Sequence, residues 1–270
     1  MKQGSKARAQ VIRTPRPSRR WLLELLWNLS VHRISLRYRE TLLGYGWILL
    51  QPVALTVIFN YIHRVAEIPT GETPYPLFVA TGLVAWSFTS LVITQSANSI
   101  GSHQVLLKRV ALPKVLFPLS SVVSSLADLA VTLILLVGLF VYYRFTPPWT
   151  SPLAILVLGV HLALLIGIGC FVSLANVFLR DMGQAVPHLL WLWFFASPVF
   201  YPVSMVPDEF RVLAKWNPMT GIIEGYRSVL LLGQPPLPDL FLPTVLVTAF
   251  ILAAGWVCFR RFEWIITDML

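Results

Sequence analysis

Five long stretches of the chain contain no Asp, Glu, Lys or Arg, and they constrain the fold more than any other feature. Each has 20 residues or more, the length that an α-helix needs to cross the hydrocarbon core of a bilayer. A sixth stretch, residues 115–143, is interrupted only by Asp128. The sequence therefore predicts an all-α integral membrane protein with six transmembrane helices. The five charge-free stretches are residues 41–63, 73–107, 145–179, 182–207 and 240–259.

The alternative, that these stretches are buried helices of a large soluble core, is excluded by composition. Hydrophobic residues make up 56% of the chain and charged residues 12%, so too little polar sequence remains to cover such a core. The basic start is followed by a mixed segment without a short apolar core and cleavage site. No removable signal peptide is therefore expected.

The positions of the basic residues predict the orientation in the membrane. Loops rich in Lys and Arg stay on the cytoplasmic side during insertion. An amino terminus on the inside places 16 of the 21 Lys and Arg on that side. We therefore expect both termini in the cytoplasm. The net charge of +9 is explained by this inner face beside anionic lipids, so a nucleic-acid partner is not expected.

The amino-terminal region divides into two parts. Residues 1–17 are basic, contain prolines and lack apolar periodicity, which is typical of a disordered tail. Ser18 is a suitable helix cap, and Trp21 and several leucines then recur at helical spacing. Residues 18–40 are therefore predicted to form an amphipathic interface helix on the cytoplasmic membrane surface. A helix packed on a protein partner is the alternative. The six-span domain takes residues 41–270.

The fifth predicted span differs from the others because it contains prolines. Pro187 is expected to open it, and Pro198 and Pro202 fall in its outer half, where protein or water must replace the lost backbone bonds. Beyond it, residues 206–239 alternate charges with short apolar pieces. This pattern predicts two short re-entrant helices on the outer side, between spans five and six. An amphipathic extracellular loop is the alternative.

Motifs for covalent chemistry are missing from the sequence. It contains no G-x-S-x-G, no H-E-x-x-H and no Gly-Lys dipeptide, and a P-loop needs the last of these to hold ATP. Cys170, Cys258 and the five histidines are scattered without metal-ligand spacing. We therefore expect neither an enzyme by itself, nor a cofactor, nor a metal site in this chain.

Four segments, in this order, resemble the permease family of type 2 ABC exporters that move O-antigen, teichoic acid and capsular polysaccharides. The resemblance covers roughly residues 20–270. The segments are RYRETLLGYGWILLQP (37–52), LLKRVALPKVLFPLSS (106–121), RDMGQAVPHLLWLWFFASPVFYP (180–202) and WNPMTGIIEGYRSVLLLG (216–233). Residues 263–270 match no motif of that family.

The resemblance implies a homodimer in the bacterial inner (plasma) membrane, surrounded by membrane lipids. Two separate ATP-binding cassette subunits would carry ATP and Mg on the cytoplasmic side. The implied cargo is a polysaccharide, O-antigen-like, on an isoprenoid-pyrophosphate carrier. Two other hypotheses stay open at this point: another type 2 exporter, for drugs or simple lipids, and a polytopic membrane enzyme of glycan assembly.

The connection between the second and third spans is the candidate contact with the ATPase. It starts with the polar residues GSHQ, continues with a short apolar turn and then becomes basic, which suits a brief helix lying across the membrane surface. In the alternative interpretation, the basic pair at 108 and 109 only follows the insertion rule. The candidate coupling residues are Gly101, His103, Leu107, Lys108 and Arg109.

Aromatic residues, 13% of the chain, are the candidates for a substrate path, because flat rings can support the apolar faces of sugars. Trp191, Phe194 and Phe195 are predicted to share a helix face because they are three and four residues apart. Interfacial belts and ordinary packing are the alternatives. The candidates are Trp47, Phe59, Trp191, Phe194, Phe195, Phe200 and Tyr201.

Three charged residues complete the candidates. Glu224 and Arg227 lie in the predicted re-entrant segment and are proposed as an outer gate. Asp128 is the carboxylate placed well inside a span, where an ionised group normally faces protein or water. We expect it to point inward toward a polar partner, either in a transport role or as a neutral acid bonded between helices.

Overall fold

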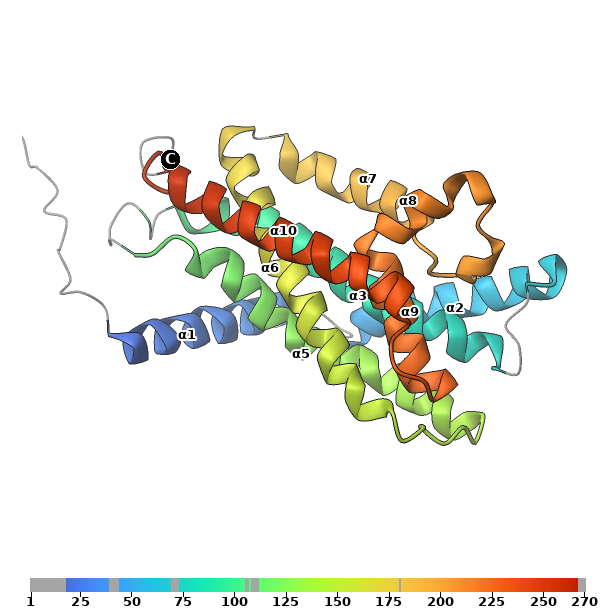
Figure 1. Ribbon diagram of the computed structural model, residues 1–270. Helices are drawn as coiled ribbons and strands as arrows, with labels where there is room; N and C mark the ends of the chain where they lie inside the picture. The colour runs from blue at the N-terminus through green and yellow to red at the C-terminus, as the bar shows by residue number, and fades with distance from the viewer. Residues whose placement is uncertain are drawn as a thin grey trace, which may run out of the picture.

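The computed structural model describes residues 18–38, 44–68, 73–104, 107, 112–179 and 181–266, and all regular structure in these ranges is helical (Figure 1). The all-α prediction is confirmed for them. The predicted tail at 1–17 lies outside the described residues. The α-helices are α1 (Arg19–Tyr38), α2 (Gly46–Ala66), α3 (Tyr75–Asn98), α5 (Leu116–Tyr142), α6 (Ala154–Phe178), α7 (Met182–Phe195), α8 (Arg211–Trp216), α9 (Pro218–Arg227) and α10 (Pro238–Phe262). Shorter turns are the 3-10 segments Gly101–His103, Ser151–Leu153, Val203–Met205 and Asp208–Phe210 and the π-helical Ser228–Leu232.

Five helices in the described ranges are long and apolar enough to cross a membrane: α2, α3, α5, α6 and α10. They coincide with five of the six predicted spans. The remaining one, predicted at 182–207, starts with α7 at Met182, so Pro187 lies inside the helix instead of opening it. With 14 residues, α7 is about 21 Å long, less than the hydrocarbon core of about 30 Å. A sixth crossing therefore depends on the irregular segment after Phe195 and stays a prediction.

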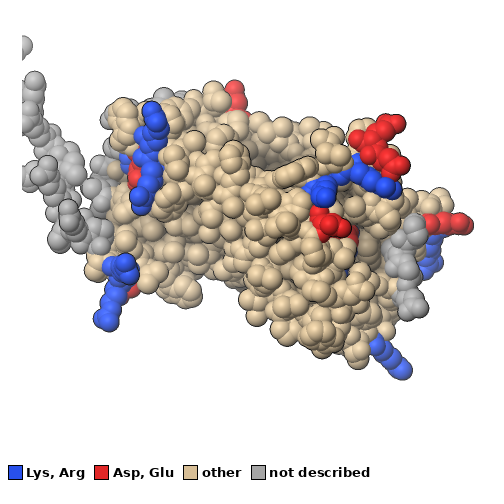
Figure 2. All heavy atoms as spheres, in the orientation of Figure 1, with Lys and Arg blue, Asp and Glu red and all other residues tan. Residues whose placement is uncertain are grey.

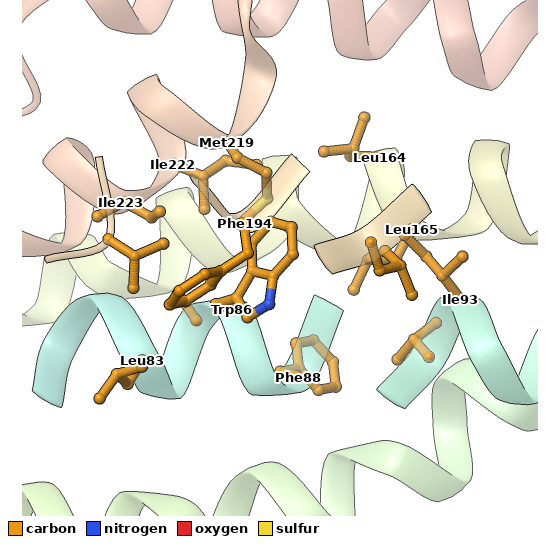
Figure 3. Close-up of a cluster of buried hydrophobic side chains, with 14 of the residues drawn as sticks. Leu83, Trp86, Phe88, Ile93, Leu164, Leu165, Phe194, Met219, Ile222 and Ile223 are labelled. Atoms are coloured by element: carbon orange, nitrogen blue, oxygen red, sulfur yellow. The ribbon is translucent and has the colours of Figure 1, made fainter. Parts of the chain in front are cut away.

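Helix α3 is the central element. Of its span, 78% is buried, against 17% for α2. It packs against α2, α5, α6, α7 and α9. Side chains from α3, α6, α7 and α9 meet in one apolar cluster (Figure 3). In a bilayer, van der Waals contact stabilises such packing, because lipid tails are as apolar as the side chains themselves. The labelled members of the cluster include Leu83, Trp86, Phe88, Leu164, Leu165, Phe194 and Ile222.

Two glycines allow α6 and α10 to approach closely. A Cβ added to Gly255 would overlap the carbonyl oxygen of Gly167. A Cβ added to Gly167 would lie 2.7 Å from Cα of Leu252. Backbones pack directly here, as small residues permit between membrane helices. In Figure 1, α10 accordingly crosses directly over α6.

The connections gather at two ends of the bundle. At one end, the backbone amide of Lys114, just before α5, donates to the Glu263 carboxylate after α10 at 2.7 Å, and the Lys114 ammonium donates to the Glu263 carbonyl. At the other end, the Thr150 hydroxyl donates to the Val229 carbonyl at 2.8 Å, and the Tyr75 hydroxyl donates to the Phe200 carbonyl at 2.8 Å. Charged side chains lie toward both ends in Figure 2, with a broad uncharged surface between them.

Helix α1 begins as predicted and packs on α5. The Ser18 hydroxyl accepts from the Trp21 amide at 3.2 Å, which confirms the cap. Leu29 is buried, and Arg33 donates to the Ser121 hydroxyl at 2.8 Å. Trp27 remains exposed. The leucine side of α1 therefore contacts this same chain, and its position at a membrane surface stays a prediction.

Candidate functional site

The aromatic candidates form a connected cluster around Phe194. The rings of Trp191, Phe194 and Phe195 contact one another with centroids 5.2–6.0 Å apart, so the predicted shared face is confirmed. Trp86 of α3 adds an edge-to-face contact with Phe194 at 5.6 Å, visible in Figure 3. Exposure differs sharply, however: Phe194 is 3% exposed, whereas Trp191 and Phe195 are each 54% exposed. Phe194 is the packing centre, and its two neighbours offer free ring surface.

The other aromatic candidates differ in the same way. Phe59 of α2 is buried and stacks on Phe200 with centroids 4.7 Å apart and nearly parallel planes. The Tyr201 hydroxyl donates to the Phe195 carbonyl at 3.2 Å. Trp47 lies at the other end of α2, about 18 Å from Phe59 along the helix axis, and is exposed. The structure therefore joins Phe59, Phe200 and Tyr201 to the cluster. A role of any of them in transport stays a prediction.

A groove of about 230 Å³ lies between α2, α3 and α7. One wall is aromatic and apolar, from α7 and Trp86. The other wall carries Gln51 of α2 and three hydroxyl residues of α3. The residues that line it are Gln51, Leu55, Trp86, Ser87, Ser90, Thr94, Pro187, Leu190, Trp191 and Phe194.

Sequence reasoning selected Trp191 and Phe194 in this groove and missed its polar side. Ser87, Ser90 and Thr94 are three and four residues apart, so they share a helix face. That spacing is a signal in the sequence. Hydroxyl residues are common in apolar spans, however, and only the position of α3 between α2 and α7 makes these three notable.

The segment after α7 is held by a buried arginine of α9. A proline at 198 clashes with the carbonyl four residues earlier and lacks an amide hydrogen, so the helix ends at Phe195. The Arg227 guanidinium donates to the carbonyls of Pro198 at 2.8 Å and Val199 at 2.6 Å. It also donates to the Phe78 carbonyl of α3 at 3.3 Å. The expectation that protein replaces the lost backbone bonds is confirmed here.

The two residues predicted to form the outer gate, Glu224 and Arg227, form an ion pair with each other. Arg227 is 1% exposed and donates to the Glu224 carboxylate at 2.7 Å. Its guanidinium carbon also lies 3.5 Å from the centroid of the Phe78 ring. Arg227 therefore joins α3, α9 and the break after α7. Gating by this pair stays a prediction.

Asn217 makes a second connection between α9 and the end of α7. Its side-chain oxygen caps α9 by accepting from the Met219 amide at 3.1 Å and also accepts from the Trp193 indole at 3.0 Å. Its amide nitrogen donates to the Ala196 carbonyl at 3.1 Å and to the Ser197 hydroxyl at 3.0 Å. Sequence reasoning did not select this residue, because its partners at the end of α7 are 20 or more residues away.

The candidate coupling residues are described in part. Gly101 and His103 form a 3-10 turn directly after α3, and Leu107 is buried. The His103 ring packs on Phe117 with centroids 5.0 Å apart, and its Nδ1 lies 2.9 Å from the Ser99 carbonyl. Burial lowers the pKa of His103, the charges of Arg33 and His32 lower it further, and the Ser99 carbonyl opposes them. Lys108 and Arg109 lie outside the described residues.

Asp128 lies on α5 and is 1% exposed. Ser121, Ser124 and Thr132 occupy the same face at spacings of seven, four and four residues, and all three are buried. This face packs within the bundle, and Ser124 donates to Gln95 of α3 at 3.5 Å. A buried polar face between helices is thus in place around Asp128, and a part in transport stays a prediction.

Comparison with known proteins finds one matching family and several similar membrane transport proteins. The profile of a family described as ABC-2 type transporter matches residues 24–231. The chain is 29% identical over 244 residues to the O-antigen export system permease protein RfbA of Myxococcus xanthus, covering 88% of this chain and 91% of that protein. It is 26% identical over 256 residues to a protein of the same name from Klebsiella pneumoniae, covering 93% and 96%. It is 24% identical to the polysialic acid transport protein KpsM of Escherichia coli, covering 76% and 80%.

Proposed function

Because the chain belongs to the ABC-2 type transporter family, we propose that it is the membrane subunit of an ATP-driven exporter of an O-antigen-like polysaccharide. The observation that carries this proposal is the match to two O-antigen export permeases over almost the whole length of both chains. The groove between α2, α3 and α7 supports it, because rings and hydroxyls together suit a sugar polymer.

The proposal includes the partners that the sequence predicts. Two copies of this chain form a homodimer in the bacterial inner membrane, and two ATP-binding cassette subunits with ATP and Mg bind on the cytoplasmic side. The cargo is a polysaccharide on an isoprenoid-pyrophosphate carrier. The connection from 101 to 113 is the contact with the ATPase, since it follows directly from the central helix α3 and can transmit force to it. Both termini are cytoplasmic.

Deletion of the gene tests the proposal. We expect surface polysaccharide to disappear from an electrophoretic gel of cell-envelope extracts, and carrier-linked polysaccharide to accumulate inside the cell. Plasmid-borne wild-type gene restores the surface signal, whereas it fails to do so when the P-loop lysine of the partner ATPase is replaced. Unchanged surface polysaccharide in the deletion strain would contradict the proposal.

A capsular polysaccharide is the second candidate cargo, favoured by the similarity to the polysialic acid transport protein. The same strains distinguish the two. Loss of capsule with an unchanged lipopolysaccharide ladder favours the second candidate, and loss of the ladder favours the first.

A further inference from the structure

The groove between α2, α3 and α7 coincides with the part of α3 that its neighbours leave uncovered. Between Leu83 and Ala97, residues of α3 are buried except at five positions. Four of the five carry polar side chains, and three of these four line the groove. The five positions are Ser87, Ser90, Leu91, Thr94 and Gln95.

Surfaces of this chain that suit lipid look different. Val137 of α5 and Leu156 of α6 are both more than half exposed, and both are apolar. A span that faces hydrocarbon gains nothing from hydroxyl groups, because lipid offers them no hydrogen-bond partner. The polar wall of the groove therefore suits water or a polar ligand better than lipid tails.

The two walls of the groove complement the two surfaces of a sugar ring. A pyranose has apolar C–H faces and a rim of hydroxyls. Trp191 of α7, which is more than half exposed, offers a flat surface for the face. The Ser and Thr hydroxyls of α3 rotate to donate or accept, and the Gln51 amide does both, so this wall suits the rim.

The uncharged lining of the groove indicates which part of the cargo binds there, the glycan or its pyrophosphate carrier. The residues that line the groove, within the described ranges, include no Lys, Arg, Asp or Glu. A pyrophosphate would require Arg, Lys or a row of backbone amides in such a site. Uncharged hydroxyl and amide groups instead form weak, exchangeable bonds, which allow a polymer to move from one residue to the next.

We propose that this groove is a sugar-binding subsite of the transport path, in which Ser87, Ser90, Thr94 and Gln51 contact glycan hydroxyls while Trp191 supports the ring face. The inference rests on the proposed function. The path predicted from the sequence consisted of aromatic side chains alone, and the proposal adds residues of α3 to it. It also assigns neutral glycan units as the ligand of this groove.

Thiol labelling tests the groove directly. In a background with Cys170→Ala and Cys258→Ala, single variants Ser87→Cys, Ser90→Cys and Thr94→Cys are made in the complete exporter in membrane vesicles. Val137→Cys on an apolar exposed face is the matched control. A charged thiosulfonate reacts with thiolates in water, so we expect the three α3 positions to react about tenfold faster than the control. Nascent polysaccharide trapped by an ATPase variant that cannot hydrolyse ATP should slow the reaction at these positions.

Two results would overturn the inference. One is labelling of all three α3 positions as slow as that of Val137→Cys. The other is that Ser90→Cys is not labelled and instead forms a spontaneous disulfide between two copies of the chain. This result would show that the polar wall is an interface between protomers.

A second experiment, on a triple variant, distinguishes an error in the proposed subsite from an error in the proposed function. We expect the combined change Ser87→Ala, Ser90→Ala and Thr94→Val to reduce surface polysaccharide several-fold, with normal membrane level and normal ATPase assembly. Ser173→Ala with Thr248→Val, which removes hydroxyls outside the groove, is the control. Normal export by the triple variant, in cells where gene deletion abolishes export, would refute the subsite and leave the proposed function in place.

Discussion

Arg227 has a charge that must be satisfied within the protein, since its guanidinium is 1% exposed and lies among membrane helices. Because Arg227 is charged and lies in the predicted re-entrant segment, sequence analysis proposed it as part of a gate. Its partners were not predictable, because the Phe78 carbonyl is 149 residues away. Ser18 shows the opposite case: a cap bonds within its own first turn, so local sequence was sufficient to predict it.

Replacing Arg227 should be the most damaging single change among the residues that join α3, α9 and the end of α7. Arg227→Leu removes three bonds to backbone carbonyls and leaves Glu224 without its cation. Removing one partner of a buried ion pair costs about 3–5 kcal/mol, so we expect a large fall in melting temperature in detergent. Arg211→Ala, which breaks an exposed ion pair with Asp208, is the control and should melt like the wild type. Equal melting of both variants would contradict the holding role of Arg227.

His103 should make the 101–107 connection sensitive to acid. Its pKa in the folded protein is lowered by burial, so the folded state favours the neutral ring more than the unfolded state does. Its contribution to stability is therefore present above the unfolded pKa of about 6.5 and is lost as pH falls through that value toward the folded pKa. After correction for the intrinsic exchange rate, which itself decreases as pH falls, we expect weaker protection of the amides in this connection at pH 5.5 than at pH 7.5. His103→Gln should remove the pH dependence, and persistence of it in that variant would implicate another group.

At the scale of elements, the spans were predictable where composition alone decides them. Four of the five charge-free stretches became α2, α3, α6 and α10, and the stretch interrupted by Asp128 became α5, because an apolar length of 20 residues has few alternatives to a helix across lipid. The end of α7 was not predictable in the same way. Pro198 indicates a break in the helix, but the side chain that replaces the lost backbone bonds, Arg227, belongs to α9 and lies 29 residues further along the chain.

The crossing of α6 and α10 gives a prediction with a control on the same helix. Gly167→Ala places a methyl group 2.7 Å from the backbone of Leu252, so we expect a loss of about 1–3 kcal/mol from overpacking. At Gly159, nothing lies within 4 Å of an added Cβ, and Gly159→Ala should be neutral or slightly stabilising. Melting temperatures in the same detergent compare the two. A smaller effect at 167 than at 159 would show that these helices separate freely.

At the scale of the whole molecule, the hydropathy of the individual spans does not indicate which helix is central. Helices α2 and α3 are both apolar spans, yet most of α3 is buried and most of α2 is not. Burial depends on neighbours from all over the chain, and the sequence carries no local sign of it. The groove was missed for this reason: its polar wall comes from α2 and α3, and its aromatic wall comes from α3 and α7.

The orientation of the whole chain is testable at its two ends. Trp149 and Asp208 lie beyond the spans, and Thr150, next to Trp149, bonds to Val229 at the same end. The distribution of basic residues predicts that this end is outside. In the cysteine-free background, Trp149→Cys and Asp208→Cys should react with an impermeant maleimide added to intact cells, whereas Gly101→Cys should react only after permeabilisation. Labelling in the reverse pattern would require an inverted topology.

The bonds of Arg227 also determine which parts of the protomer can move. The Arg227 side chain belongs to α9 and donates hydrogen bonds to the start of α3 and to the segment after α7. Because the bilayer core contains no water, a shift of any one of these three parts alone would leave backbone carbonyls without donors. The start of α3, the end of α7 and α9 should therefore move as one rigid body. In the homodimer proposed above, a passage wide enough for a polymer then opens by separation of two such bodies, and its width depends on the contact between copies.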